Sequence, residues 1–429
     1  MTLPTRPYKG TRDFYPEAMA FRRWMFGTLE KTVCRFGFEE YDGPILESFD
    51  LYAAKTGEEI VKNQLYWMED RGGRKLAIRP EMTPTMARMV AAKIQELPRP
   101  IRWYSIPNLW RYERPQRGRL REHWQLNADI LDGDVQFADL EILQLAFSVM
   151  EAFGGGEFIE IRINHRAMVD EYFEKVIGVT TEVAHGLIKL IDLKDKMEAE
   201  SFNEKLSALG LTESQAQSVI QFFELEYNEI SEKISGSGKL EMDRLFENLK
   251  GSQLEHAVVY DPSILRGMDY YTGLVFEIYD KSPENRRALF GGGRYDNLLG
   301  LFGKTQLSGI GFGMGDVGLE NFLLTHDLIP LVRNRKDVYV SMTDERYEKL
   351  CIQVTEDLRA KGLSVVTPLS VGKLKIQLKQ ANQHDAHFLV ILGEEEFENN
   401  CASVKNLDTG DQFQCSIGEI FNRINTDLN

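Results

Sequence analysis

The sequence predicts an α+β protein with an N-terminal part over residues 1–330, a helical insertion at about 166–252, and a smaller α/β domain over 331–429. The last part of the chain alternates between strand-like and helix-like segments, which is typical of a small α/β domain. The insertion is indicated by helical periodicity in a stretch that contains none of the chain's 14 prolines. Strand-like sequence lies on both sides of it, and this mixture favours the α+β class.

The composition predicts a cytoplasmic protein with an excess of acidic residues. The 429 residues carry a formal net charge of -15, which argues against a broad nucleic-acid-binding surface. The four cysteines form no C-x-x-C pair, so we expect neither a disulfide framework nor a zinc site, and a reducing compartment is favoured. No apolar run reaches the length of a membrane helix, and we therefore expect no membrane partner.

The N-terminal region predicts a helix followed by an edge strand. The helix over 17–37 is indicated by apolar residues at intervals of three to four, namely Phe21, Met25, Leu29, Val33 and Phe36. Gly37 is placed to end it. The next segment, FEEYDGPILE, reads as a strand interrupted by Asp42, Gly43 and Pro44. Because proline cannot donate to a central ladder, we expect this strand at an edge or an interface.

Residues 101–131 predict a hairpin whose second limb has two different faces. Polar and apolar side chains alternate along this limb, as in a strand that packs one face on the core. The polar face consists of Arg119, Arg121, His123, Gln125, Asn127 and Asp129. Such a face is interpreted either as a solvated outer surface or as the floor of a binding site, and the pattern leaves both open.

Five arginines are concentrated in the same region, within residues 111–125: Arg111, Arg114, Arg117, Arg119 and Arg121. Arginine presents a planar fork that matches phosphate and carboxylate groups. The cluster therefore indicates a polyphosphate ligand met at a local patch. A solvated charged loop is the more common explanation for a run of charges.

Two glycine-rich segments lead to different predictions. The three glycines of 291–293, followed by Arg294, predict a flexible turn beside a charge. In the segment 308–316 every second residue is glycine, which in a strand removes side chains from one face. That bare face is expected to accept a flat group such as a purine or a crossing backbone, or to pack closely under a helix.

Two further segments combine charge with a restricted backbone. IRPEMTP, 78–84, holds Glu81 and Thr83 between two prolines, which reads as a rigid turn that binds a ligand amine. It also reads as a helix N-terminus with Thr83 as N-cap and Pro84 at the first helical position, and the two interpretations are compatible. LRGMDYYTGLVFE, 265–277, places Arg266 beside two tyrosines, as in a small polar pocket or an ordinary strand with core tyrosines.

The sequence does not favour a metal centre or covalent catalysis. His384 and His387 are three residues apart, but no third cysteine or histidine ligand lies nearby in the sequence. We therefore expect no metal held by protein side chains. No Ser-His-Asp or Cys-His arrangement is apparent either.

Taken in order, these segments resemble the motifs of the histidyl-tRNA synthetases, a family of class II aminoacyl-tRNA synthetases. GFEEYDGPILE is similar to the family's dimer-interface motif 1, WRYERPQRGRLREHWQLNADI to motif 2, and GIGFGMG to motif 3. LRGMDYYTGLVFE and GGGRYDNLL resemble its two histidine-specific motifs. KLKIQLKQANQHDAHFLVILGEEEF resembles its C-terminal anticodon-binding domain. The resemblance spans nearly the whole chain.

The resemblance implies a homodimer whose catalytic domain is an antiparallel sheet flanked by helices. Such a ligase activates L-histidine with ATP to histidyl-adenylate and pyrophosphate, and then transfers the histidyl group to tRNA(His), with Mg²⁺ bridging the outer phosphates of ATP. The alternative is a non-catalytic paralogue that serves as the histidine-sensing regulatory subunit of ATP phosphoribosyltransferase. Such paralogues usually lose the anticodon-binding domain and the RG-x-D-Y-Y motif, and this chain has both.

The resemblance also implies a role for each motif residue. The catalytic residues would be Arg266 and Arg111. Histidine would be bound by Glu81, Met82, Thr83, Arg111, Gln125, Asp129, Arg266, Tyr270, Tyr271 and Tyr295. ATP would be bound by Arg111, Glu113, Arg119, Gly309, Gly311 and Gly313. The tRNA acceptor end would be met by Arg114, Gln116 and Arg117.

The chain departs from the family's pattern at three places, one of which is RPEMTP in place of RPEGT. Gly318 stands where many members carry an arginine after motif 3, so either another cation contacts ATP or ATP binding is weaker. Asp129 stands where a glutamate is common.

Overall fold

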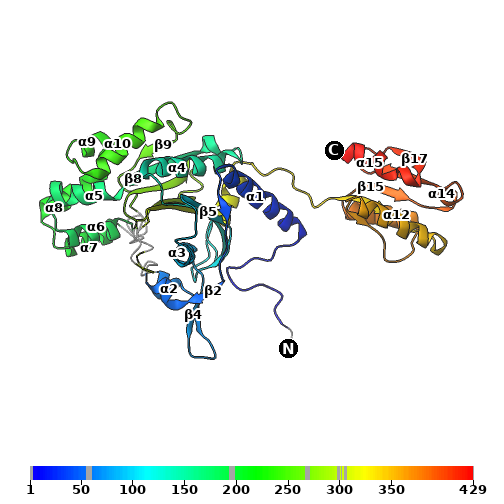
Figure 1. Ribbon diagram of the computed structural model, residues 1–429, viewed down its shortest axis with the longest axis horizontal. Coiled ribbons are helices and arrows are strands. Elements are labelled where there is room, and N and C mark those ends of the chain that lie inside the picture. Colours follow the sequence, from blue (N-terminus) through cyan, green and yellow to red (C-terminus); the bar gives the residue numbers. More distant parts are fainter. Residues whose placement is uncertain are drawn as a thin grey trace. The chain divides into compact units, whose positions relative to one another are not determined.

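The computed structural model describes residues 3–54, 60–192, 199–265, 271–296, 300, 302–303 and 307–428 (Figure 1). These residues form two compact units. One contains residues 1–13 with 22–330, and the other contains 331–429 with 14–21. Arg266 and Tyr270, both expected in the site, lie outside the described residues.

The larger unit is built on one extended, mainly antiparallel sheet. Its strands lie in the order β1 (Glu39–Glu40), β5 (Ile101–Ser105), β7 (Glu122–Leu131), β12 (Gly309–Gly315), β11 (Phe290–Arg294), β10 (Leu274–Asp280), β8 (Ile159–His165) and β9 (Val258–Tyr260). β6 (Asn108–Trp110) also pairs with β7. The β1–β5 and β8–β9 pairs at the two edges are parallel. The predicted edge strand is therefore confirmed, because β1 comes from the FEEYDGPILE segment.

A second, smaller sheet lies in the same unit. It has the order β2 (Leu46–Ser48), β4 (Lys75–Ile78) and β3 (Trp67–Glu69). Outside the insertion, the described part of this unit contains α2 (Phe49–Ala53), α3 (Thr83–Ala92), α4 (Val135–Glu151) and α11 (Asp316–Thr325). It also contains α1 (Pro16–Arg35) from residue 22 onward. Helix α1 ends where it was expected, since Gly37 adopts a positive φ of 74° that suits glycine.

The region between β8 and β9 is helical over the described residues. It contains α5 (Arg166–Glu171), α6 (Thr181–Asp192), α7 (Ala199–Ala208), α8 (Glu213–Phe222), α9 (Tyr227–Ser231) and α10 (Ser237–Leu249). These helices gather beside β8 and β9 and next to α4 (green in Figure 1). The amphipathic stretches predicted as helical insertion are thus helices packed at one edge of the large sheet.

The segment of three glycines departs from its prediction. Residues 290–294 form the buried strand β11 between β10 and β12, not a flexible turn. A Cβ on Gly292 would lie 2.7 Å from the Cβ of Phe312, and one on Gly293 would lie 2.8 Å from the carbonyl oxygen of Leu274. Glycine is needed here because neighbouring strands approach closely, which the sequence pattern alone does not distinguish from a turn.

The smaller unit is an α/β domain with a mixed sheet. The strands lie in the order β14 (Val365–Val366), β13 (Lys336–Val340), β15 (Ala386–Ile391), β16 (Cys401–Asn406) and β17 (Gln412–Ser416). Its helices are α12 (Glu348–Ala360), α13 (Leu374–Gln383), α14 (Glu394–Glu398) and α15 (Ile420–Leu428). The β16–β17 hairpin was not foreseen from the sequence.

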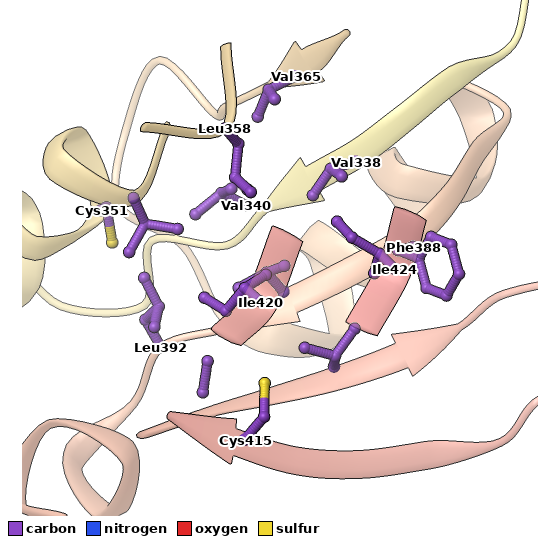
Figure 2. Close-up of a cluster of buried hydrophobic side chains, with 14 of the residues drawn as sticks. Val338, Val340, Cys351, Leu358, Val365, Phe388, Leu392, Cys415, Ile420 and Ile424 are labelled. Carbon is purple, nitrogen blue, oxygen red and sulfur yellow. The ribbon is translucent and has the colours of Figure 1, made fainter. Parts of the chain in front are cut away.

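The core of this unit forms between the sheet and two helices. Figure 2 shows Val338, Val340 and Phe388 from the strands pointing toward apolar side chains of α12 and α15. Ile420 and Ile424 of α15 are fully buried in this cluster. One turn of helix separates these two residues, so the last helix closes the core with a single apolar stripe.

Candidate active site

A small pocket opens on the large sheet at β7, β11 and β12. Its volume is about 90 Å³. It is lined by Glu81, Thr83, Arg111, Gln125, Asn127, Asp129, Tyr271, Gly291, Tyr295, Gly311, Phe312 and Gly313. Segments far apart in the sequence thus deliver two carboxyl groups, a guanidinium and two tyrosines to one place. Concave sites with a few convergent polar groups are the usual binding sites of small molecules.

The sheet positions the polar groups on the pocket floor. Gln125, Asn127 and Asp129 alternate along β7, so their side chains project from the same face. This confirms the expected polar face over these three residues and shows that it belongs to a pocket. Arg119 and Arg121 precede the strand, which begins only at Glu122.

The alternating glycines of β12 make room for those side chains. A Cβ on Gly313 would lie 2.5 Å from Nε2 of Gln125, and one on Gly311 would overlap Oδ1 of Asp129. A Cβ on Gly309 would lie 2.5 Å from the ring of Tyr295. The space that these glycines leave is occupied by Gln125, Asp129 and Tyr295, and Gly311 and Gly313 also line the pocket.

Asp129 is a carboxyl group of the pocket whose pKa is strongly raised. It is buried, and it accepts a hydrogen bond from the hydroxyl of Tyr295. Burial raises the pKa of Asp129 to about 7, although the Tyr295 hydrogen bond acts in the opposite direction. Near neutral pH this group is therefore able both to accept and to donate a hydrogen bond.

A buried ion pair holds the end of β11, next to Tyr295. Nε of Arg294 lies 2.9 Å from Oδ1 of Asp139 on α4, and Arg294 also donates to the carbonyl oxygen of Val135 and to Ser308. Burial raises the pKa of Asp139 to about 6, and the charge of Arg294 opposes this shift. The pair fixes the strand that carries Tyr295 against α4.

Arg111 and Glu81 reach the pocket from segments outside the β7, β11 and β12 strands. Arg111 follows β6, and its Nε donates to the carbonyl oxygen of Pro80 at 2.9 Å. Glu81 is buried, directly before α3. Helix α3 begins one residue earlier than the interpretation of Thr83 as N-cap required, since Met82 is the N-cap and Thr83 the first helical residue.

His123 lies near these cations and was not expected to be a site residue. Burial, followed by the positive charges of Arg111, Arg12 and Arg119, lowers the pKa of His123 to about 3. The imidazole is therefore neutral at physiological pH. Its place on the polar face of the hairpin was the only signal of it in the sequence.

The loop between β6 and β7 carries the remaining arginines. Arg114, Gln116, Arg117 and Arg119 are exposed there. The loop is closed by paired backbone hydrogen bonds of 3.0 Å between Gln116 and Arg119. Nη2 of Arg117 lies 3.3 Å from Oε2 of Glu284.

The pocket unites most, but not all, of the residues predicted for it. Met82 differs, because its side chain is fully buried in a hydrophobic cluster with Met86 and Val90. Among the described residues, those predicted to contact ATP or tRNA but absent from the pocket wall are Glu113, Arg114, Gln116, Arg117, Arg119 and Gly309. Asn127, Gly291 and Phe312 line the pocket without having been assigned to it.

The comparisons with known proteins point to the same family along nearly the whole chain. The family model described as "Histidyl-tRNA synthetase" matches residues 10–315, and the one described as "Anticodon binding domain" matches residues 328–427. The "Histidine--tRNA ligase" of Leptospira biflexa serovar Patoc is 43% identical over 430 residues, which cover 99% of this chain and 98% of that protein. The protein of the same name from Thermoplasma volcanium is 37% identical over 422 residues, 96% of either chain.

The fold is also shared with solved structures. The crystal structure of histidyl-tRNA synthetase from Nostoc sp. PCC 7120 superposes with a TM-score of 0.81, covering 99% of this chain and 100% of that chain at 21% sequence identity. This likeness shows the class II synthetase fold. Together with the full-length relatives, it shows that the similarity extends over the chain and is not confined to short motifs. The chain belongs to the histidyl-tRNA synthetase family.

Proposed function

We propose that this chain ligates L-histidine to tRNA(His) in two steps, first forming histidyl-adenylate from histidine and ATP. The observation that carries the proposal is the convergence of Glu81, Arg111, Gln125, Asp129 and Tyr295 on one pocket in a chain of this family. An amino acid offers an ammonium, a carboxylate and a side chain, and the pocket has a partner for each.

The imidazole of histidine is assigned to the Asp129 end of the pocket. The pKa of Asp129, raised by burial to about 7, allows its carboxyl group to accept from a ring N–H or to donate to a ring nitrogen. The Tyr295 hydroxyl supplies a second hydrogen-bonding group. An amino acid without ring nitrogens would offer the buried Asp129 carboxyl group no hydrogen bond beyond the one from Tyr295, which is the physical basis for rejecting it.

The charged ends of the amino acid are assigned to the opposite side. Glu81 would bind the ammonium, and Arg111 would hold the carboxylate against the α-phosphate of ATP. In the activation step a carboxylate oxygen forms a bond to the α-phosphorus, and the bond from that phosphorus to the bridging oxygen breaks. Pyrophosphate leaves with the electron pair. Arg111 acts by position and by its positive charge, which opposes the charge that builds on the phosphate oxygens.

Further groups of the nucleotide site are proposed from the family pattern. Arg266, the second proposed catalytic arginine, and Tyr270 with Tyr271 would complete the histidine site. Glu113, Arg119 and the backbone of β12 would contact ATP. Nη1 of Arg119 lies 3.5 Å from Oε2 of Glu113, so the two form an ion pair.

Mg²⁺ fits this site only as a companion of ATP. Among the described residues there is no group of three or more His, Cys, Asp or Glu side chains arranged for a metal ion. This suits an ion that binds mainly through phosphate oxygens and water. When bound, Mg²⁺ would offset the negative charge of the outer phosphates.

The domain assignment follows the same proposal. Residues 1–330 would form the catalytic domain, with the helical insertion at about 166–252, and residues 331–429 would bind the anticodon of the tRNA. The exposed loop residues Arg114, Gln116 and Arg117 would meet the acceptor end. With four cysteines, all free in the structure, the chain suits the reducing cytoplasm. None of the described helices has the length and apolar composition needed to cross a membrane.

A homodimer is proposed from the small β2–β4–β3 sheet. It exposes Leu46 and Met68, which the strand register places on the same face, whereas large apolar side chains are normally covered. A second copy of the chain would cover this face. Met68→Glu should therefore shift the sedimentation coefficient toward that of a monomer, while the exposed Leu369→Glu in the other unit should not.

The regulatory alternative is not supported by the domain content. The chain retains the 328–427 match to the anticodon-binding domain, for which a histidine-sensing subunit has no use. The test is incubation with a tRNA(His) transcript, ATP and labelled histidine. Label that precipitates with the RNA is expected, whereas a dimer that binds histidine but never labels the RNA would point to the regulatory role.

A further inference from the structure

We propose that Tyr8, Arg121 and Tyr112 form a stacking platform for an unpaired nucleobase at the acceptor end of the tRNA. The inference rests on the proposed function, because it needs tRNA as a substrate. It assigns a role to an N-terminal tyrosine and to a loop tyrosine that the catalytic pocket does not use.

The three side chains are stacked on one another. The guanidinium carbon of Arg121 lies 4.1 Å from the ring centre of Tyr112 and 5.3 Å from that of Tyr8. Nη1 of Arg121 donates a hydrogen bond of 2.6 Å to the Tyr8 hydroxyl. Each tyrosine is nevertheless 52% exposed, so each retains a large area of ring surface in contact with solvent.

The backbone holds this stack in place before any ligand arrives. The amide of Arg121 donates to the carbonyl oxygen of Gly10 at 2.9 Å, which ties the N-terminal segment to the loop. Gly10 has a φ of +88°, and a Cβ there would lie 2.8 Å from Cγ of Arg121. The amide of Tyr112 donates to Gln64 at 2.7 Å, and Tyr66 meets the Tyr112 ring edge-on at 5.5 Å. Such preorganisation lowers the entropy lost on binding.

The surroundings favour RNA as the occupant. Arg111, next to Tyr112 in the sequence, lines the catalytic pocket, and the loop that follows exposes Arg114, Arg117 and Arg119. In a chain of net charge -15, this is a local cationic patch with aromatic rings at its base. Aromatic rings beside a basic path are how proteins bind single-stranded nucleic acid, because every base has a face that stacks. The 3′ end of a tRNA is single-stranded and must reach the pocket.

Full-length protein and two RNAs test the proposal: a complete tRNA(His) transcript and the same transcript without its single-stranded 3′ end. Binding is measured for Tyr112→Ala, Tyr8→Ala, Tyr112→Phe and a control, Tyr15→Ala, which removes another tyrosine that is 71% exposed. We expect each platform alanine variant to weaken binding of the complete tRNA about 5-fold to 100-fold, the range for loss of one stacked base. Tyr112→Phe should keep most of the parent's affinity for the complete tRNA, since the ring that stacks is kept.

The truncated RNA separates stacking from loss of structure. It should bind the parent and the platform variants equally, because the base that stacks is missing. An equal loss with both RNAs, or no loss with either, would overturn the proposal. A raised KM for ATP in histidine-dependent pyrophosphate exchange by Tyr112→Ala would also overturn it, by assigning the rings to adenine.

These outcomes are distinct from failure of the proposed function. If the parent protein neither exchanges pyrophosphate nor charges tRNA, the proposed function fails. If the parent does both and the platform variants bind and charge the complete tRNA like Tyr15→Ala, only the platform is refuted.

Discussion

Replacing Asp129 with asparagine should stabilise the larger unit, and the gain in unfolding free energy should increase as the pH rises. Asp129 is buried, and desolvation raises its pKa to about 7 from the ordinary 3.8. The folded state therefore favours the protonated form, and the stability linked to this group is lost as the pH rises through about 7. Asparagine has nearly the same shape, keeps an oxygen for the Tyr295 hydroxyl and cannot ionise.

The magnitude follows from the two pKa values. One pH unit between them corresponds to about 1.36 kcal/mol. Ionisation of Asp129 then costs the folded state roughly 4 kcal/mol at pH 8 and roughly 1.5 kcal/mol at pH 5, relative to the unfolded chain. The stability advantage of Asp129→Asn should thus grow by roughly 2.5 kcal/mol between these pH values. Other buried carboxyl groups, such as Asp139, are present in both proteins and cancel in the difference.

Urea unfolding followed by tryptophan fluorescence measures this difference in unfolding free energy for the larger of the two compact units. All five tryptophans lie in the segment from Trp24 to Trp124, so their emission reports on the larger unit alone. The matched control is Asp327→Asn, at an exposed position with a φ of 54° that aspartate and asparagine both tolerate. An advantage of Asp129→Asn that stays constant from pH 5 to pH 8 would refute the reasoning, as would an equal pH-dependent advantage for the control.

Three further substitutions test other parts of the structure. Gly311→Ala should lower histidine-dependent pyrophosphate exchange at least about 100-fold, because its Cβ would overlap Asp129 and lie 2.6 Å from the Ala128 carbonyl oxygen; Gly315→Ala, with no described heavy atom within 4 Å of the new Cβ, should lose far less. Asp139→Ala should destabilise the larger unit by about 3–5 kcal/mol in the same urea assay, since the buried Arg294 charge loses its partner. Glu96→Ala, which breaks the exposed pair with Lys93, is the control, and an equal effect of the two substitutions would contradict this expectation. Asp134→Ala should cost about 1 kcal/mol, because the Asp134 side chain caps α4 by accepting from the amides of Gln136 and Phe137.

The fold was largely predictable because its signals are periodic and local. The apolar spacing of α1, the alternation along β7 and the strand–helix order after residue 331 each follow from one structural period. The glycines were the weak point. Gly291, Gly292 and Gly293 are extended because β10 and β12 press against them, and no local pattern carries information about that contact.

The site was predictable only through the resemblance of its motifs to a family. Alternation put Asp129 and Gln125 on one face, but nothing local says that Tyr295 reaches Asp129 across the sheet or that glycines of β12 make the space. Met82 was misplaced for the same reason: its neighbours Glu81 and Thr83 face the pocket, while its own side chain points into the core. Burial of His123 among Arg111, Arg12 and Arg119 likewise depends on segments that meet only in the folded chain.

The most direct test of the account is pyrophosphate exchange into ATP by the purified protein, run with each of the twenty amino acids in turn. We expect exchange with histidine alone. We also expect Asp129→Ala to lower the exchange rate by a larger factor than it lowers the fraction of folded protein, as judged by tryptophan emission. Exchange supported by a different amino acid would contradict the proposed specificity. No exchange from a folded protein that binds histidine would contradict the proposed catalysis and favour the regulatory role.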